Sequence, residues 1–173
     1  MARDILKTLQ SEHDALRALF EEMAGTTDRA VKKRGDLLQQ IEANLLPHAK
    51  WEETVFYPEF RDRADRDGQQ TYAEAVQEHR AVELAVLPDL KAAAPGTPGF
   101  AGSAKVLGEL IDHHATEEET TMFKMARKLF SAQERAELDE NYEEWKQSPI
   151  GMAAVAGEKA KGGLKAVARS VTR

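Results

Sequence analysis

The feature that most constrains this chain is an internal repeat with an offset of 66 residues. Each copy holds a lone histidine and, 35 residues later, a His-x-x-x-Glu pair. The matching positions are Glu12-His13 with Glu78-His79, and His48 and Glu52 with His114 and Glu118. Four of the five histidines therefore lie at duplicated positions, and the fifth, His113, is adjacent to one of them. This duplication predicts two equivalent halves.

Hydrophobic residues recur at three- and four-residue steps along every long segment, which is typical of amphipathic helices. The pattern predicts helices over about residues 5–23, 28–65, 69–93, 103–130 and 132–147. Each of the first four helices then carries one duplicated histidine. Four long helices joined by short turns predict an all-α fold, an antiparallel up-and-down four-helix bundle with additional C-terminal helices.

Helix boundaries follow from capping residues, prolines and glycines. Thr27 or Asp28 is placed to cap the second helix, and Ser131-Ala-Gln-Glu134 resembles a capping box for the fifth. We expect a bend near Pro47, a loosened end near Pro58 and a bend or end near Pro88. Ser148-Pro149 ends the fifth helix, and a short amphipathic tail helix, weakened by Gly157, Gly162 and Gly163, follows. We therefore divide the chain into a bundle, residues 1–147, and a tail, residues 148–173.

Composition excludes several classes of protein. Hydrophobic residues make up 42% and charged residues 31% of the chain, and no apolar run approaches the roughly 20 residues that a membrane span needs. Neither a secretion signal nor a cysteine is present, so we expect a cytoplasmic protein whose metals are held by His, carboxylate or phenolate. Residues 1–147 carry a net charge of −10, which argues against a nucleic-acid partner. The tail carries +4 and could contact a protein or anionic partner through Lys159, Lys161, Lys165, Arg169 and Arg173.

The repeated residue types suit a metal centre. Residues i and i+4 of a helix lie about 40° apart, so His48 and Glu52 can point at one spot. An antiparallel bundle brings both copies together and predicts one centre with the ligands His13, His48, Glu52, His79, His114 and Glu118. Imidazole with carboxylate suits iron, and also manganese or zinc. The Glu-x-x-His motif of ferritin-like bundles and the His-Glu-x-x-His motif of zinc proteases are both absent.

These residues resemble the hemerythrin-like HHE domain, and the resemblance covers about residues 1–130, with a basic tail similar to that of small actinobacterial members. It implies two non-haem iron ions as the cofactor, in an oxo- or hydroxo-bridged centre that is also bridged by Glu52 and Glu118. It further implies a small-molecule partner, O2, H2O2 or NO. Reported activities of the family include oxygen binding, peroxide breakdown, nitric-oxide handling and iron sensing. No catalytic residue beyond the metal ligands is predicted.

Three residues are candidates for a further ligand. Oxygen-carrying hemerythrins have a histidine where this chain has Glu83, four residues after His79. They also use a five-residue spacing that His113 and Glu118 reproduce, but His113 aligns with Pro47 in the repeat, which favours His114. Tyr57 ranks below Glu83, because an ideal α-helix places it about 180° from His48. Its alternative role is packing, the role expected for the neighbouring apolar residues Trp51, Val55, Phe56, Phe60, Met122 and Phe123.

The ligand count favours chemistry on peroxide. Four histidines, two bridging carboxylates and a bridging oxygen leave two positions open on two octahedral ions, or one if Glu83 binds. An additional open position favours peroxide decomposition over reversible oxygen storage. The alternatives are a non-catalytic protein that binds or senses O2, NO or iron, and an iron store, which a single small site disfavours. Glu53, Glu117 and Glu119 are expected to be solvated or to lie just behind the ligands, and because Glu53 and Glu119 repeat, one of them is expected to hold a histidine N–H.

Overall fold

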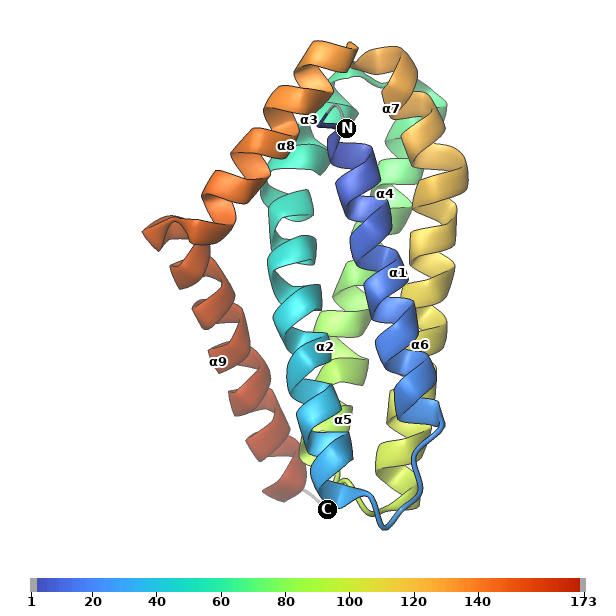
Figure 1. Ribbon diagram of the computed structural model, residues 1–173, viewed down its shortest axis with the longest axis vertical. Helices are drawn as coiled ribbons and strands as arrows, with labels where there is room; N and C mark the ends of the chain where they lie inside the picture. The colour runs from blue at the N-terminus through green and yellow to red at the C-terminus, as the bar shows by residue number, and fades with distance from the viewer. Residues whose placement is uncertain (1–2, 172–173) are drawn as a thin grey trace.

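Four antiparallel helical rods form the body of the molecule (Figure 1). The structure is a computed structural model that describes residues 3–171, with the side chains of residues 3–160. The rods are α1 (Ile5–Ala24); α2 (Val31–Trp51) continued by η1 (Glu52–Phe56) and α3 (Tyr57–Arg63); α4 (Arg66–Ala81) continued by η2 (Val82–Val86) and α5 (Leu87–Ala92); and α6 (Pro98–Glu117) continued by η3 (Glu118–Met122) and α7 (Phe123–Leu129). The predicted all-α bundle is confirmed, and residues 3–171 contain no strand.

The segments η1, η2 and η3 are π-helical turns, in which the N–H group bonds to the fifth residue before it. Two of them begin at the glutamates of the repeat, Glu52 and Glu118, and so lie at equivalent positions. Pro58 and Pro88 follow η1 and η2 in the first turn of α3 and α5, where the missing N–H removes an α-helical bond. Lys124 stands at the position equivalent to Pro58, so proline is not required for the turn.

The structure confirms one predicted helix cap and contradicts another. The capping box of Ser131 and Glu134 is confirmed at the start of α8 (Ala132–Gln147). The expected cap of the second helix is wrong, because α2 begins after Ala30 without a side-chain cap. Asp28 instead accepts a hydrogen bond from Arg34 Nη1 at 3.0 Å. Pro47 lies inside α2, which continues to Trp51.

The core consists of two hydrophobic layers with a polar layer between them. One layer, towards the chain's N-terminus, includes Leu9 and is built mainly from aromatic residues: Trp51, Phe56, Tyr57, Phe60, Phe123, Phe130 and Tyr142. The other includes Leu16 and is mainly aliphatic, with Leu37, Ile41, Leu45, Leu90, Leu107 and Ile111 among its members. On α1, the buried His13 falls between Leu9 and Leu16, so the histidines lie between the two layers.

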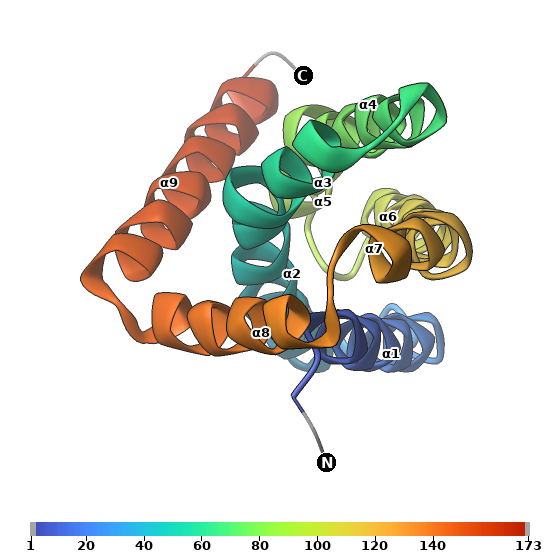
Figure 2. The ribbon, with the colours of Figure 1, turned by 90° about the horizontal axis from the view of Figure 1, so that it is seen from above.

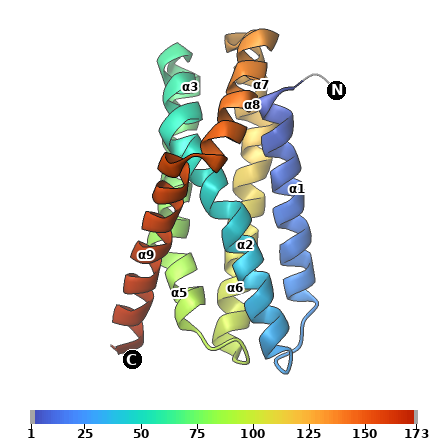
Figure 3. The ribbon, with the colours of Figure 1, turned by 60° about the vertical axis from the view of Figure 1, so that its left-hand side comes forward.

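The two C-terminal helices pack outside the four rods. Helix α8 lies against α1 and α2, and α9 (Pro149–Val171) turns back to run beside α2 and α5 (Figures 2 and 3). The tail helix is therefore not short, as predicted, but spans 23 residues. Gly162, Gly163 and the basic residues Lys161, Lys165, Arg169 and Arg173 lie outside the described side chains. Within the described residues, no helix has the length and apolar character that a membrane crossing requires.

Candidate metal centre

One histidine from each rod points into the polar layer. His13 lies on α1, His48 on α2, His79 on α4 and His114 on α6, and all four are buried. The Nε2 atoms face one another in two pairs, His13 with His48 at 3.1 Å and His79 with His114 at 3.0 Å. The rods thus bring together all four histidines that the repeat singled out.

The two repeated glutamates lie between the histidine pairs. Glu52 Oε1 is 3.1 Å from His48 Nε2, and its Oε2 is 3.6 Å from His79 Nε2. Glu118 Oε2 is 3.2 Å from His13 Nε2 and 3.7 Å from His114 Nε2. Two groups of atoms suited to metal binding result, one from His13, His48, Glu52 and Glu118, the other from Glu52, His79 and His114. Each carboxylate reaches both pairs, which is the position of a bridging ligand.

Each histidine is held from behind by a further carboxylate. Because an ionised carboxylate can only accept, each Nδ1 atom donates, and Nε2 is left as the ring atom that can bind a metal at the centre. The four hydrogen bonds are His13 to Glu119 at 2.9 Å, His48 to Glu12 at 2.8 Å, His79 to Glu53 at 3.1 Å and His114 to Glu78 at 2.7 Å. These outer carboxylates fix the rings in the orientation that metal binding needs.

Sequence reasoning found only part of this outer set. We expected Glu53 or Glu119 to hold a histidine, and both do. Glu12 and Glu78 were not assigned this role, although the same 66-residue offset relates them and was the available signal. Each of them hydrogen-bonds to a histidine of another rod, Glu12 to His48 and Glu78 to His114, and not to the histidine that follows it in the sequence. Glu117 lies outside the outer set, 3.6 Å from the exposed His113.

Tyr57 faces the centre, so the predicted helical phase is wrong. Its hydroxyl donates to Glu118 Oε1 at 2.8 Å and lies 3.2 Å from Nε2 of both His79 and His114. The π turn η1 lies between His48 and Tyr57, and each residue of such a turn advances the helix by less than 100°. Glu83, ranked higher, is half-buried and belongs to neither group of ligand atoms. His113 is 61% exposed.

The charges of the centre favour a bound cation. Burial alone would lower the pKa of His48, but Glu52 and Glu12 raise it to about 10. Burial likewise opposes the charge of Glu118, yet His114 and His13 hold the pKa of that carboxyl well below its usual value. Burial and the neighbouring Glu118 raise the pKa of Tyr57 well above its ordinary value, so the phenol stays neutral. Carboxylates therefore outnumber fixed positive charges in this layer.

Three buried oxygen atoms test whether a metal fits. Glu52 Oε1, Glu52 Oε2 and Glu118 Oε2 accept no hydrogen bond from the described residues. Leaving a charged oxygen buried without a partner is costly, and a dication at the centre removes that cost. The Nε2 atoms of each histidine pair, 3.1 Å and 3.0 Å apart, are close enough to bind the same cation. The donor set of imidazole and carboxylate thus fits a metal site.

Comparison with known proteins agrees with this geometry. The chain matches the hemerythrin HHE cation-binding domain over residues 4–146, which includes every residue of the two ligand groups. The chain belongs to the hemerythrin HHE cation-binding family. A solved HHE domain-containing protein from Mycobacterium kansasii superimposes with a TM-score of 0.71 at 20% identity, covering 90% of this chain and 98% of that one. This likeness supports the hemerythrin-like fold.

A curated relative is a DNA nickase from Nostoc sp. PCC 7120, which is 28% identical over 132 residues. The match covers 76% of the hemerythrin chain described here but only 36% of the nickase. The chain therefore spans about a third of the length of this relative.

The two C-terminal helices of this hemerythrin-family chain contribute residues that lie next to the outer carboxylates. On α8, the Tyr142 hydroxyl donates to Glu12 at 2.8 Å and Lys146 lies 3.1 Å from the same carboxylate. Lys50 lies 3.1 Å from Glu53 and 3.3 Å from Glu158 of α9. Helix α8 thus contacts an outer carboxylate directly, and α9 is connected to another through Lys50.

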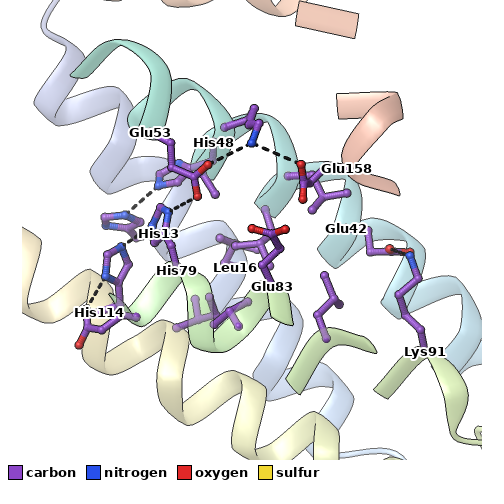
Figure 4. Close-up of a pocket in the computed structure, with 18 residues that line it drawn as sticks. His13, Leu16, Glu42, His48, Glu53, His79, Glu83, Lys91, His114 and Glu158 are labelled. Carbon is purple, nitrogen blue, oxygen red and sulfur yellow. Dashed lines mark hydrogen bonds and ion pairs between the residues drawn. The ribbon is translucent and has the colours of Figure 1, made fainter. Parts of the chain in front are cut away.

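A cavity of about 60 Å³ adjoins the histidines (Figure 4). All four metal-facing histidines line it, together with Glu53 and Glu83. The rest of its wall combines the apolar residues Leu16, Leu45, Leu46, Ala49, Val82, Leu87 and Ile111 with the charged residues Glu42, Lys50, Glu78, Lys91 and Glu158. The space accommodates a molecule of two to four atoms next to the centre.

Removing an outer carboxylate is expected to weaken metal binding without removing a ligand. In a Glu12→Ala variant, His48 loses the acceptor that fixes its ring, so we expect metal affinity to fall by about 10- to 100-fold. Competition with a chromophoric chelator measures this change. Glu22→Ala, which removes an exposed charge from the same helix, is the control and should bind as the wild type does. Unchanged affinity in Glu12→Ala would contradict the assigned role.

Proposed function

We propose that this chain holds two non-haem iron ions and decomposes hydrogen peroxide to water and oxygen. The proposed ligands are His13 and His48 for one ion and His79 and His114 for the other, with Glu52 and Glu118 shared. The shared position of the two carboxylates, each within 3.7 Å of a histidine from both pairs, supports a dinuclear site. An iron pair supplies two neighbouring one-electron redox centres, which suits the two-electron chemistry of peroxide.

The observation that carries this proposal is the cavity that reaches all four metal-facing histidines. If protein ligands filled every coordination position of the ions, a small molecule in this cavity could not bind to them. Glu83 lines the cavity and belongs to neither group of ligand atoms, which supports the open positions that the ligand count predicts. The volume accommodates a molecule of about the size of hydrogen peroxide.

The surrounding residues support peroxide chemistry in two ways. Tyr57 provides a neutral, buried O–H group at Glu118, so a hydrogen-bond donor lies beside the proposed ions. The apolar wall formed by Leu45, Leu46 and Ile111 limits bulk water at the centre. In the overall reaction, two molecules of hydrogen peroxide give two of water and one of oxygen, so one peroxide is reduced and the other oxidised.

The second candidate is a protein that binds or senses O2 or NO without turnover. The apolar wall of the cavity favours it, because these diatomic molecules are poorly hydrated and need no hydrogen-bond partner there. In this case residues 148–173, which we propose as a tail distinct from the bundle of residues 1–147, are the candidate element for a partner. A pull-down that depends on residues 150–173 would support a signalling role.

Oxygen evolution separates the two functions. Iron-loaded wild-type protein mixed with hydrogen peroxide is expected to release one O2 for every two peroxide molecules, over many turnovers per chain. A His114→Ala variant and metal-free wild-type protein should release little. The Glu22→Ala variant, with an unchanged centre, should match the wild type. Absence of turnover in the loaded wild type, together with a long-lived and reversible oxygen-dependent spectrum, would replace peroxide decomposition with oxygen binding.

A further inference from the structure

A second group of residues suited to metal binding lies on the surface beside the proposed centre. It consists of Glu78 on α4 and of His113 and Glu117 on α6. His113 Nε2 is 3.4 Å from Glu78 Oε1 and 3.6 Å from Glu117 Oε1. His113 and Glu117 are 61% and 42% exposed, so an ion in solvent can reach both. One imidazole and two carboxylates suit a divalent transition-metal ion.

Glu78 joins this surface group to the buried centre. Its Oε1 faces His113, while its Oε2 accepts the Nδ1–H of the buried His114 at 2.7 Å. A pocket of about 10 Å³ is lined by residues of both sites, among them Glu78 and Glu117 of the surface group and His114 and Glu118 of the centre. This volume accommodates about one water-sized particle. Residues of the surface group and of the centre therefore share the wall of one narrow space.

The other three outer carboxylates are covered by permanent cations. Lys146 lies 3.1 Å from Glu12, Lys50 lies 3.1 Å from Glu53, and Arg17 lies 2.9 Å from Glu119. A fixed positive charge repels an approaching metal ion and cannot ligate it. Among the side chains of residues 3–160, the partners of Glu78 within ion-pair distance are instead two histidines, His113 and His114. The approach to the centre is thus electrostatically open at Glu78.

The repeat shows that this group is not a by-product of the duplicated ligand set. The positions that match His113 and Glu117 in the first half of the chain are Pro47 and Trp51, neither of which binds metals. Trp51 is fully buried in the aromatic layer. The surface group therefore exists in one half of the bundle, where the approximate symmetry of the centre breaks down.

We infer that Glu78, His113 and Glu117 form an uptake site that captures a divalent metal ion from solvent and delivers it past His114 to Glu118. The inference rests on the proposed metal centre, since an uptake site needs a destination. Exposed ligands bind the ion weakly, so it can leave again. Glu78 and Glu118 both line the small pocket and so provide carboxylates for the ion on its way inward.

The rate of metal loading tests this inference. Metal-free protein is mixed with limiting Co²⁺, and the absorption of the bound ion is followed in a stopped-flow instrument. The test variant is the double substitution His113→Ala, Glu117→Gln, which leaves the Glu78–His114 hydrogen bond in place. We expect loading to slow by about tenfold or more, since local attraction raises the rate of capture by about 10- to 1,000-fold. In a separate titration with excess Co²⁺, the final content at the centre should remain two ions per chain.

Glu109→Gln is the matched control. Glu109 lies on α6 and pairs with Lys105 on the surface, so the variant loses the same charge two turns away from Glu117 and should load at the wild-type rate. Equal rates for wild type and the double variant would overturn the uptake site. So would a fall in the final ion content of the double variant, because the residues would then act on the centre itself.

A second measurement observes the surface site directly. Mn²⁺ added to protein whose centre is already loaded should broaden the amide signals of residues 113–117 and of Glu78 in the wild type, and should not do so in the double variant. The absence of broadening in the wild type would overturn the site. Failure of the proposed centre gives a different result, because wild-type protein would then not take up two ions at any time.

Discussion

Replacing Glu52 with alanine is expected to reduce metal binding from two ions per chain to fewer than one. Glu52 belongs to both groups of ligand atoms, with one carboxylate oxygen towards His48 and the other towards His79. Its loss therefore removes a ligand from each proposed ion at once. It also removes a negative charge from between the two cations, which increases their mutual repulsion. We expect activity that depends on the ions to disappear with them.

The matched control for this substitution is its neighbour in the sequence. Glu53→Ala removes the same side chain one residue later, where it holds the His79 ring but contacts no proposed ion position. This variant should still bind two ions, with an affinity lower by about 10- to 100-fold. Elemental analysis after gel filtration in excess metal measures both variants, and circular dichroism checks that they remain helical. Two ions retained by Glu52→Ala would rule out a shared role for this carboxylate.

The general plan of the bundle was accessible from the sequence because it depends on periodicity. Helical spacing of apolar residues gave the rods, and the 66-residue offset gave their correspondence. Since His48 and Glu52 are four residues apart, they face the same way in any α-helix, and the antiparallel arrangement brings them opposite their repeats. The convergence of His13, His48, His79 and His114 required nothing more than these regularities.

The position of Tyr57 was not accessible in this way, because it depends on a departure from periodicity. An ideal α-helix directs Tyr57 away from His48, whereas the π turn η1 rotates it towards Glu118. No residue type marks such a turn reliably: Pro58 follows η1, but Lys124 stands at the same place after η3. π turns are frequent at functional sites of proteins. Because η1 and η3 both begin at a repeated glutamate of the centre, we infer that these turns position the metal-facing residues.

The outer carboxylates show a second limit of sequence reasoning. Glu12 directly precedes His13, and neighbouring residues of a helix point in directions about 100° apart. Glu12 therefore cannot support its own neighbour, and it contacts His48 of the next rod instead. Which rods are adjacent decides this pairing, and adjacency is a property of the three-dimensional packing. The length of α9 was missed for a related reason, because its contacts with α2 and α5 outweigh its glycines.

Loading with metal is expected to raise the melting temperature of the wild-type protein strongly. The proposed ions would bind residues of all four rods in the folded state and would find few organised ligands in the unfolded chain, so binding would stabilise folding. At a free ion concentration about 1,000 times the dissociation constant, each site contributes about 4 kcal/mol. For a chain of this size, 1 kcal/mol raises the melting temperature by about 2–4 °C, so two sites predict a rise of about 15–30 °C.

The metal-free protein provides the physical reason for so large an effect. Its polar layer buries Glu52 and Glu118 with three oxygen atoms that accept no hydrogen bond from the described residues, between two hydrophobic layers that admit little water. Differential scanning calorimetry with iron, and again after chelation, measures the change. Glu52→Ala is the control and should melt at nearly the same temperature in both conditions. A wild-type shift of only a few degrees would mean that the four rods do not share a tightly bound metal pair.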